Sequence, residues 1–137
     1  MGATDALTKK KCQPCEGIGK ALDVVKIKEC LPLTPGWTVA ADGKGITREF
    51  VMRNFLAAVR FIGEIADIAE AENHHPDIHL TGYRKLKIDL TTHALGGLSE
   101  NDFIVAAKIN ALAMELKNTK QEAESQEAKK RISLNGS

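Results

Sequence analysis

The sequence lacks a strong net charge, a long apolar run and a signal for export. Its 19 Lys and Arg against 18 Asp and Glu leave a formal net charge of +1, which gives no general attraction to nucleic acid or anionic membranes. No apolar run approaches the roughly 20 residues of a membrane-spanning helix, and residues 1–11 contain no apolar signal core. We therefore expect a cytoplasmic protein, with an organelle as the alternative, that contacts neither nucleic acid nor membrane directly.

The sequence also has few cysteines, and their number is odd. Three cysteines suit a secreted disulfide framework poorly. Cys12 and Cys15 form a C-x-x-C pair, but a structural zinc site needs further ligands of this kind. Only Cys30 remains, and no histidine is near in the sequence. We expect reduced thiols, with a metal or redox site as the alternative.

The length and composition predict one globular domain. The chain has 137 residues, of which 43% are hydrophobic and 27% charged, as in ordinary globular proteins. We place the domain at residues 18–117, after a polar, flexible N-terminal segment over residues 1–17. Residues 118–137 have almost nothing to bury, so they are expected to form a polar helical extension or a disordered tail.

The hydrophobic periodicity predicts three helices and two hairpins. Helical spacing is found over residues 18–31, 54–73 and 99–117, and alternation typical of strands over residues 37–41, 46–51, 76–81 and 85–92. In the last strand, Leu86, Ile88 and Leu90 share one face. Strands joined by short turns pair antiparallel. The order α-β-β-α-β-β-α therefore predicts an α+β fold, a four-stranded antiparallel sheet with helices packed on one face.

The helix over residues 54–73 is apolar over most of its circumference. One stripe contains Phe55, Val59, Ile62, Ala66 and Ala69, and a second contains Phe61, Ile65 and Ile68. Arg60 and Glu64 are four residues apart and are expected to be able to pair. Such a helix needs cover on two sides, by the sheet and by another helix or subunit. We expect a homodimer or homotetramer.

Two adjacent histidines end this helix. Pro76 cannot continue a helix because it has no backbone N–H, so His74 and His75 are expected to point in different directions. Glu70 and His74 are four residues apart and share a helix face. His93 follows the last strand, whose end lies near the start of the preceding strand in an antiparallel pair. His93 is therefore expected close to the His74–His75 corner.

A second carboxylate is expected at the same corner. Asp102 lies in the first turn of the last helix, where it forms a capping box with Ser99. Each polar residue has an ordinary structural explanation, and His79 is expected on the outer sheet face. Three histidines and two carboxylates at one corner nevertheless favour chemistry. They could bind zinc or carry out metal-free acid–base catalysis.

The spacing of these residues resembles that of the pterin-4a-carbinolamine dehydratase family. The matching residues are Glu70, His74, His75, Pro76, Tyr83, His93 and Asp102. The resemblance extends from residues 35–37 to residues 107–110 and includes residues 97–100. One departure is Ile78, which stands where many members carry a tryptophan and would alter one wall of the pocket.

The resemblance implies the α+β fold and a specific reaction. Members dehydrate 4a-hydroxytetrahydropterin to quinonoid dihydropterin, without metal or cofactor, in tetrahydrobiopterin recycling. It implies that His74 and His93 transfer protons, with His75 as the third histidine of the catalytic group. Glu70 and Asp102 would fix the histidine tautomers.

The resemblance also implies how the pterin is held. His75 and Pro76 would bind it, and Trp37 would stack on its ring, with a plain core position as the alternative for Trp37. Two other functions remain open. One is a homo-oligomeric binding protein that acts as dimerisation cofactor of a transcription factor. The other is a zinc-dependent hydrolase.

Overall fold

The computed structural model describes residues 3–117 and contains an α+β fold, as predicted. Its helices are α1 (Ala3–Thr8), α2 (Cys15–Ile18), α3 (Val24–Cys30), α4 (Phe55–Glu72) and α5 (Glu100–Asn110), with 3-10 turns at Leu31–Leu33 and His93–Leu95. Its strands are β1 (Thr38–Val39), β2 (Ile46–Val51), β3 (Asp77–Thr81) and β4 (Lys85–Leu90). The predicted tail over residues 118–137 lies outside the described residues. Within them, no helix is long and apolar enough to cross a membrane.

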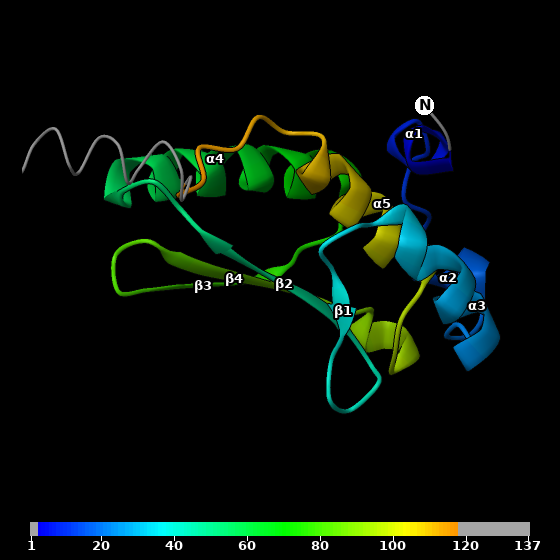
Figure 1. Ribbon diagram of the computed structural model, residues 1–137. Coiled ribbons are helices and arrows are strands. Elements are labelled where there is room, and N and C mark those ends of the chain that lie inside the picture. The colour runs from blue at the N-terminus through cyan, green and yellow to red at the C-terminus, as the bar shows by residue number, and fades with distance from the viewer. Residues whose placement is uncertain (1–2, 118–137) are drawn as a thin grey trace, which may run out of the picture.

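The four strands form one antiparallel sheet in the order β1-β2-β4-β3. Helices α4 and α5 lie on the same side of it (Figure 1). Leu86, Ile88 and Leu90 are at most 1% exposed, which confirms the predicted alternation of β4. Asp77 pairs with Asp89, so the start of β3 lies beside the end of β4, as expected.

Helix α4 closely follows its predicted bounds because both ends carry clear signals. The Asn54 side chain accepts a hydrogen bond from the Ala57 N–H at 2.8 Å, which caps the first turn. At the other end Asn73 adopts a left-handed conformation with φ 52°, a common way to end a helix. The stripe with Phe61 and Ile65 is buried against the core, and both residues are at most 2% exposed.

The first predicted helix, over residues 18–31, was wrong in its N-terminal half. Gly19 has a φ of +90°, a left-handed conformation that interrupts a helix. Asp23 then starts α3 by accepting a hydrogen bond from the Lys26 N–H at 2.9 Å. The apolar spacing was correct over α3, but the chain before it forms the separate short helix α2.

The predicted end of the last helix at residue 117 was also wrong, because α5 ends at Asn110. The following chain is extended and runs beside the end of β2, where Lys117 N–H donates to Val51 O at 2.7 Å. Leu112 and Leu116 fit helical spacing, but with Met114 between them they also fit the alternation of an extended segment. All three pack partly buried against the core.

Two smaller expectations changed as well. Strands predicted over residues 37–41 and 85–92 are shorter, Thr38–Val39 and Lys85–Leu90. Arg60 pairs with Glu115 at 3.1 Å rather than with Glu64. The extended segment after α5 brings Glu115 within reach of α4, which helical spacing alone could not indicate.

Residues 3–13 make contacts that the sequence analysis did not predict. Helix α1 packs against α5, and Leu7 is 3% exposed within the main core. Cys12 and Gln13 are hydrogen-bonded to residues at the ends of α4 and α5. Because the segment is mostly polar, its sequence did not indicate that Leu7 packs into the core.

Candidate active site

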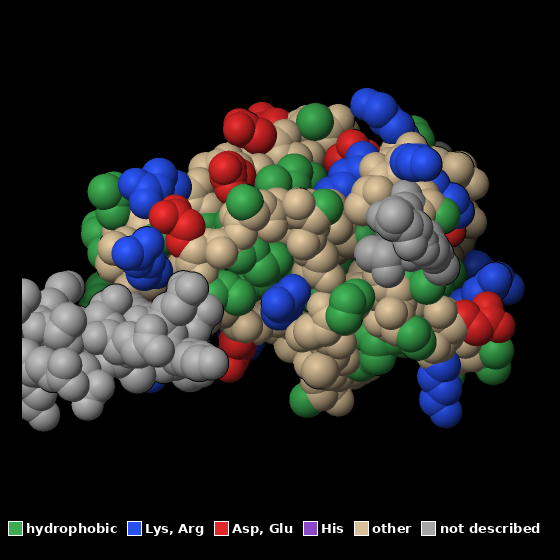
Figure 2. All heavy atoms as spheres, turned by 45° about the horizontal axis from the view of Figure 1, so that its top comes forward, with side chains coloured by type: hydrophobic (Ala, Val, Ile, Leu, Met, Phe, Trp, Pro, Cys, Tyr) green, Lys and Arg blue, Asp and Glu red, His purple; other side chains and the backbone are tan. Residues whose placement is uncertain are grey.

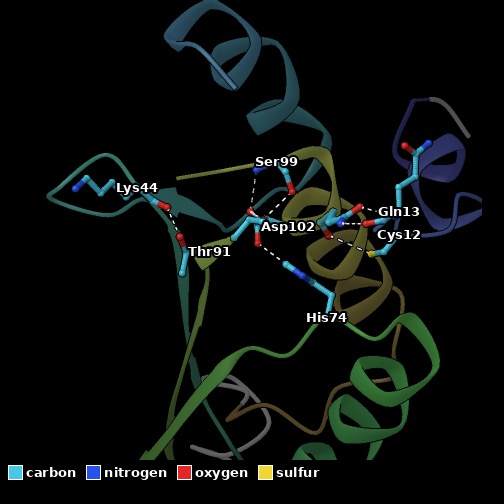
Figure 3. A network of polar contacts seen from close by, with 9 residues as sticks. Cys12, Gln13, Lys44, His74, Thr91, Ser99 and Asp102 are labelled. Carbon is cyan, nitrogen blue, oxygen red and sulfur yellow. Dashed lines mark hydrogen bonds and ion pairs between the residues drawn. The ribbon is translucent and has the colours of Figure 1, made fainter. Parts of the chain in front are cut away.

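His74 lies where the end of α4 meets the start of α5. Its backbone N–H donates to Ala69 O at 3.1 Å, which ties it to the last turn of α4. Its ring Nε2 lies 2.6 Å from Asp102 Oδ1 (Figure 3). The His74 side chain is 11% exposed, whereas that of Asp102 is fully buried. The predicted approach of Asp102 to this corner is confirmed.

Asp102 is held rigidly because it also caps α5. Its Oδ2 accepts hydrogen bonds from the Ser99 N–H at 2.9 Å and the Thr92 hydroxyl at 2.8 Å. The predicted capping box with Ser99 is present. A carboxylate only accepts hydrogen bonds, so His74 Nε2 must carry the proton in this contact. In neutral His74 the lone pair of the ring is therefore on Nδ1.

His75 points to a different partner, as the break at Pro76 predicts. Its Nε2 lies 2.5 Å from Glu70 Oε2, and the two side chains are 55% and 76% exposed. Glu70 was expected to share a helix face with His74, and its side chain pairs with His75. Once the chain leaves the helix at Asn73, it turns His75 back along the last turn of α4.

His93 lies in the 3-10 turn after β4 and lines a cavity of about 600 Å³. Asp42, Lys44, Asp89 and Thr91 supply polar groups to the same cavity. The Thr91 hydroxyl donates a hydrogen bond to Lys44 O at 2.5 Å. This bond joins the two segments of the cavity wall that contain Thr91 and Lys44. His74 pairs with Asp102 and His75 with Glu70, and His93 enters neither pair.

The structure also contains a histidine–carboxylate pair that the sequence analysis missed. His79 is exposed on the sheet, as predicted, and its Nε2 lies 3.1 Å from Asp89 Oδ2. Asp89 lies in β4 and lines the cavity beside His93. The pair is diagonal across β3 and β4, since His79 stands opposite Lys87. Only the strand register, which depends on the turn between them, could have indicated this contact.

Trp37 belongs to the core rather than to the His74 corner. It is 3% exposed, and its Nε1–H donates to Asn110 Oδ1 at 2.9 Å. This position matches the core alternative considered for Trp37, because a buried ring with a satisfied N–H offers almost no surface for stacking.

The thiol of Cys12 is poorly suited to redox or metal chemistry. Burial, followed by the negative charge of nearby Glu72, raises the pKa of Cys12 to about 12. The thiol therefore stays protonated at neutral pH, and the thiolate is the reactive form. Among the side chains described over residues 3–117, no group of three or more His, Cys, Asp or Glu is arranged to hold a metal ion.

Comparison with known proteins identifies the family. The family model described as pterin 4 alpha carbinolamine dehydratase matches residues 20–112. This span includes the whole sheet, both long helices and every residue of the His74 and His75 pairs. The chain is a member of the pterin-4a-carbinolamine dehydratase family.

Individual members of the dehydratase family match most of the chain. A Legionella pneumophila (strain Corby) protein named "Putative pterin-4-alpha-carbinolamine dehydratase" is 46% identical over 82% of this chain and 99% of its own. The Arabidopsis thaliana protein named "Pterin-4-alpha-carbinolamine dehydratase 2, mitochondrial" is 43% identical over 80% of this chain and 60% of its own.

A solved structure supports the same assignment. A Brucella melitensis protein described as a transcriptional coactivator/pterin dehydratase has a TM-score of 0.64 and 32% sequence identity. The match covers 67% of this chain and 97% of that protein. These dehydratase-family relatives support a dehydratase at the level of the family.

Proposed function

We propose that this protein dehydrates 4a-hydroxytetrahydropterin to quinonoid dihydropterin and water, in tetrahydrobiopterin recycling. The observation that carries the proposal is the hydrogen bond between His74 and the buried Asp102, within a member of the dehydratase family. A histidine titrates near neutrality, and a fixed carboxylate gives this one a defined tautomer.

The reaction needs two proton transfers. The C4a–O bond breaks as the leaving hydroxide receives a proton, which releases water. The N5–H bond loses its proton to a base, and its electron pair forms the new double bond between N5 and C4a. The pterin ring stabilises the developing positive charge, so the chemistry requires no metal or cofactor.

We assign these transfers to His74 and His93. The lone pair on Nδ1 of neutral His74 supports it as the base at N5, because Asp102 would stabilise the imidazolium that forms. His93 would then donate a proton to the 4a-hydroxyl. His75, paired with Glu70, would hold the pterin together with Pro76.

The cavity beside His93 supports a small-molecule site at this histidine, although His74 and His75 are not among its lining residues. Its volume of about 600 Å³ lies in the range of about 300–1,000 Å³ found for small-molecule sites. Its walls carry hydrogen-bonding groups from Lys44, Asp89 and Thr91, which suit a polar heterocycle.

A second copy of the chain is proposed to cover α4. Phe55, Leu56 and Val59 are 55%, 59% and 43% exposed along this helix. Figure 2 shows apolar side chains among charged ones at the surface on this side of the molecule. We infer a homodimer or homotetramer from this face. The Brucella relative's description as a coactivator makes binding of a transcription factor a second candidate function.

The direct test is a stopped-flow assay of the purified protein with 4a-hydroxytetrahydropterin. We expect the rate of quinonoid dihydropterin formation to exceed the uncatalysed rate and to scale with protein concentration. A rate no greater than the uncatalysed one would contradict the dehydratase proposal and leave the binding function.

A further inference from the structure

A cluster of hydrogen bonds fastens the N-terminal segment to the ends of α4 and α5. Cys12 N–H donates to Glu72 Oε1 at 2.9 Å, and Gln13 N–H donates to Asn101 Oδ1 at 2.9 Å. Asn101 Nδ2 returns a hydrogen bond to Gln13 O at 2.7 Å. Lys108 Nζ donates to Glu72 Oε2 at 2.6 Å. We call these five residues the N-terminal clasp.

Glu72 and Asn101 are the buried members of the clasp, whereas Cys12 and Lys108 are half-buried and Gln13 is exposed. Asn101 is 3% exposed, and the Glu72 side chain is 5% exposed. Burial alone would oppose ionisation of Glu72, but the hydrogen bonds from Lys108 and Cys12 outweigh it, and its pKa lies below the ordinary value. Breaking one member would leave a buried polar group without its partner, which is costly. The contacts are therefore a fixed connection rather than a loose surface attachment.

The clasp lies beside the His74–Asp102 contact on both helices. Glu72 is the last residue of α4, two positions before His74, and Asn101 immediately precedes Asp102 in α5. In Figure 3, Asp102 extends toward His74 from one side of α5, while Cys12 and Gln13 lie on the other side. The clasp thus ties together the two helix ends whose separation sets the distance from His74 to Asp102.

We propose that the N-terminal clasp holds the His74–Asp102 hydrogen bond in place, with Glu72 and Asn101 as positioning residues. Their side-chain hydrogen bonds go to Cys12, Gln13 and Lys108. Each acts through the helix end that carries a partner. The consequence for catalysis rests on the proposed role of His74, whereas the consequence for the hydrogen bond does not.

The test compares Asn101→Ala with the matched control Lys10→Ala. Lys10 links the same segment to the same helix through Glu100 at 3.0 Å, but both side chains are nearly half exposed. A short charge-assisted hydrogen bond gives its proton a downfield NMR resonance, which His74→Ala identifies by removing it. We expect Asn101→Ala to lose this resonance and to lower kcat by about 10-fold or more, since small misplacements have such effects. KM of Asn101→Ala should change little. Lys10→Ala should keep both the resonance and the wild-type kcat.

A second variant leaves α4 and α5 unaltered. Gln13→Pro removes the backbone N–H that donates a hydrogen bond to Asn101 Oδ1. It therefore opens the clasp from the N-terminal segment. Circular dichroism of each variant establishes that it is folded. A folded Asn101→Ala or Gln13→Pro protein with the wild-type resonance would overturn the proposal.

The two readouts separate this proposal from the proposed function. Loss of the resonance in the clasp variants, together with a wild-type protein that does not accelerate dehydration, would support the clasp and contradict the dehydratase. If instead the wild-type protein accelerates dehydration but the clasp variants keep the resonance, the clasp proposal is contradicted and the dehydratase proposal is supported.

Discussion

At the scale of single residues, the two adjacent histidines differ in their surroundings. His74 contacts a buried carboxylate, whereas His75 and Glu70 form a pair that is mostly in water. A solvent-exposed ion pair contributes little to stability, so the His75 contact is better suited to binding than to support of the fold. The fixed geometry of His74 suits the proton transfer proposed for it.

His74→Ala should therefore lower kcat by about 100-fold or more, because general acid–base groups typically contribute 10²–10⁴-fold. The stopped-flow assay measures this directly. Lys26→Ala is a suitable control, since Lys26 forms an exposed pair with Glu29 on α3, away from His74. Wild-type turnover in His74→Ala would exclude His74 from proton transfer.

At the scale of elements, the position of His74 depends on how α4 ends. Asn73 is one of two described non-glycine residues with a positive φ, and its N–H donates to Ala69 and Glu70 carbonyls. The left-handed conformation costs most residues about 1–2 kcal/mol, and asparagine is among the few that adopt it readily. The end of α4 is thus specified by one side chain.

Asn73→Ala should destabilise the protein by about 1 kcal/mol, because alanine tolerates the left-handed conformation less well. Asn73→Gly should keep or slightly raise the stability, since glycine adopts a positive φ without a steric penalty. Urea unfolding followed by circular dichroism provides the measurement. Equal losses in both variants would show that the asparagine side chain, rather than its backbone conformation, matters here.

The sequence predicted elements best where local signals bounded them. The bounds of β2 matched residues 46–51, and Asn54 and Asn73 flank α4 as expected. The His74–Asp102 approach was also predictable, because a helix end and a capping residue fixed both partners. The end of α5 was not, since residues 112–116 fit two periodicities. The clasp could not be predicted either. It joins backbone groups of residues 12–13 to side chains 60 and 88 positions away, and hydrophobic periodicity does not indicate such contacts.

At the scale of the whole molecule, the clasp makes the stability depend on pH. The folded-state pKa of Glu72 lies below its ordinary value of 4.5. Its contribution to stability is therefore present above pH 4.5 and lost as the pH falls through the folded-state pKa. We expect the free energy of unfolding to fall more steeply on acidification in wild type than in Glu72→Gln.

Urea unfolding across this acidic range measures the difference. Glu100→Gln is the control, because Glu100 is 46% exposed in its pair with Lys10 and should leave the slope as in wild type. Identical slopes in wild type and Glu72→Gln would mean that Glu72 does not couple protonation to folding.

The exposed apolar face of α4 is the proposed contact between copies of the chain. Val59→Glu should yield a species of lower mass than wild type in size-exclusion chromatography with light scattering, because a charge in an apolar interface opposes association. Val24→Glu, at a valine that is 64% exposed on α3, should leave the mass unchanged. A wild-type protein that is already monomeric would contradict the proposed oligomer.

The double attachment of Asp102 has a consequence for how relatives of this chain are interpreted. One of its oxygens completes the cap of α5 and the other meets His74. A descendant that abandoned catalysis and kept only a binding role would still need Asp102 to begin that helix. Retention of the aspartate therefore says little about activity, whereas replacement of His74 beside an unchanged Asp102 would mark the loss of the chemistry proposed for His74.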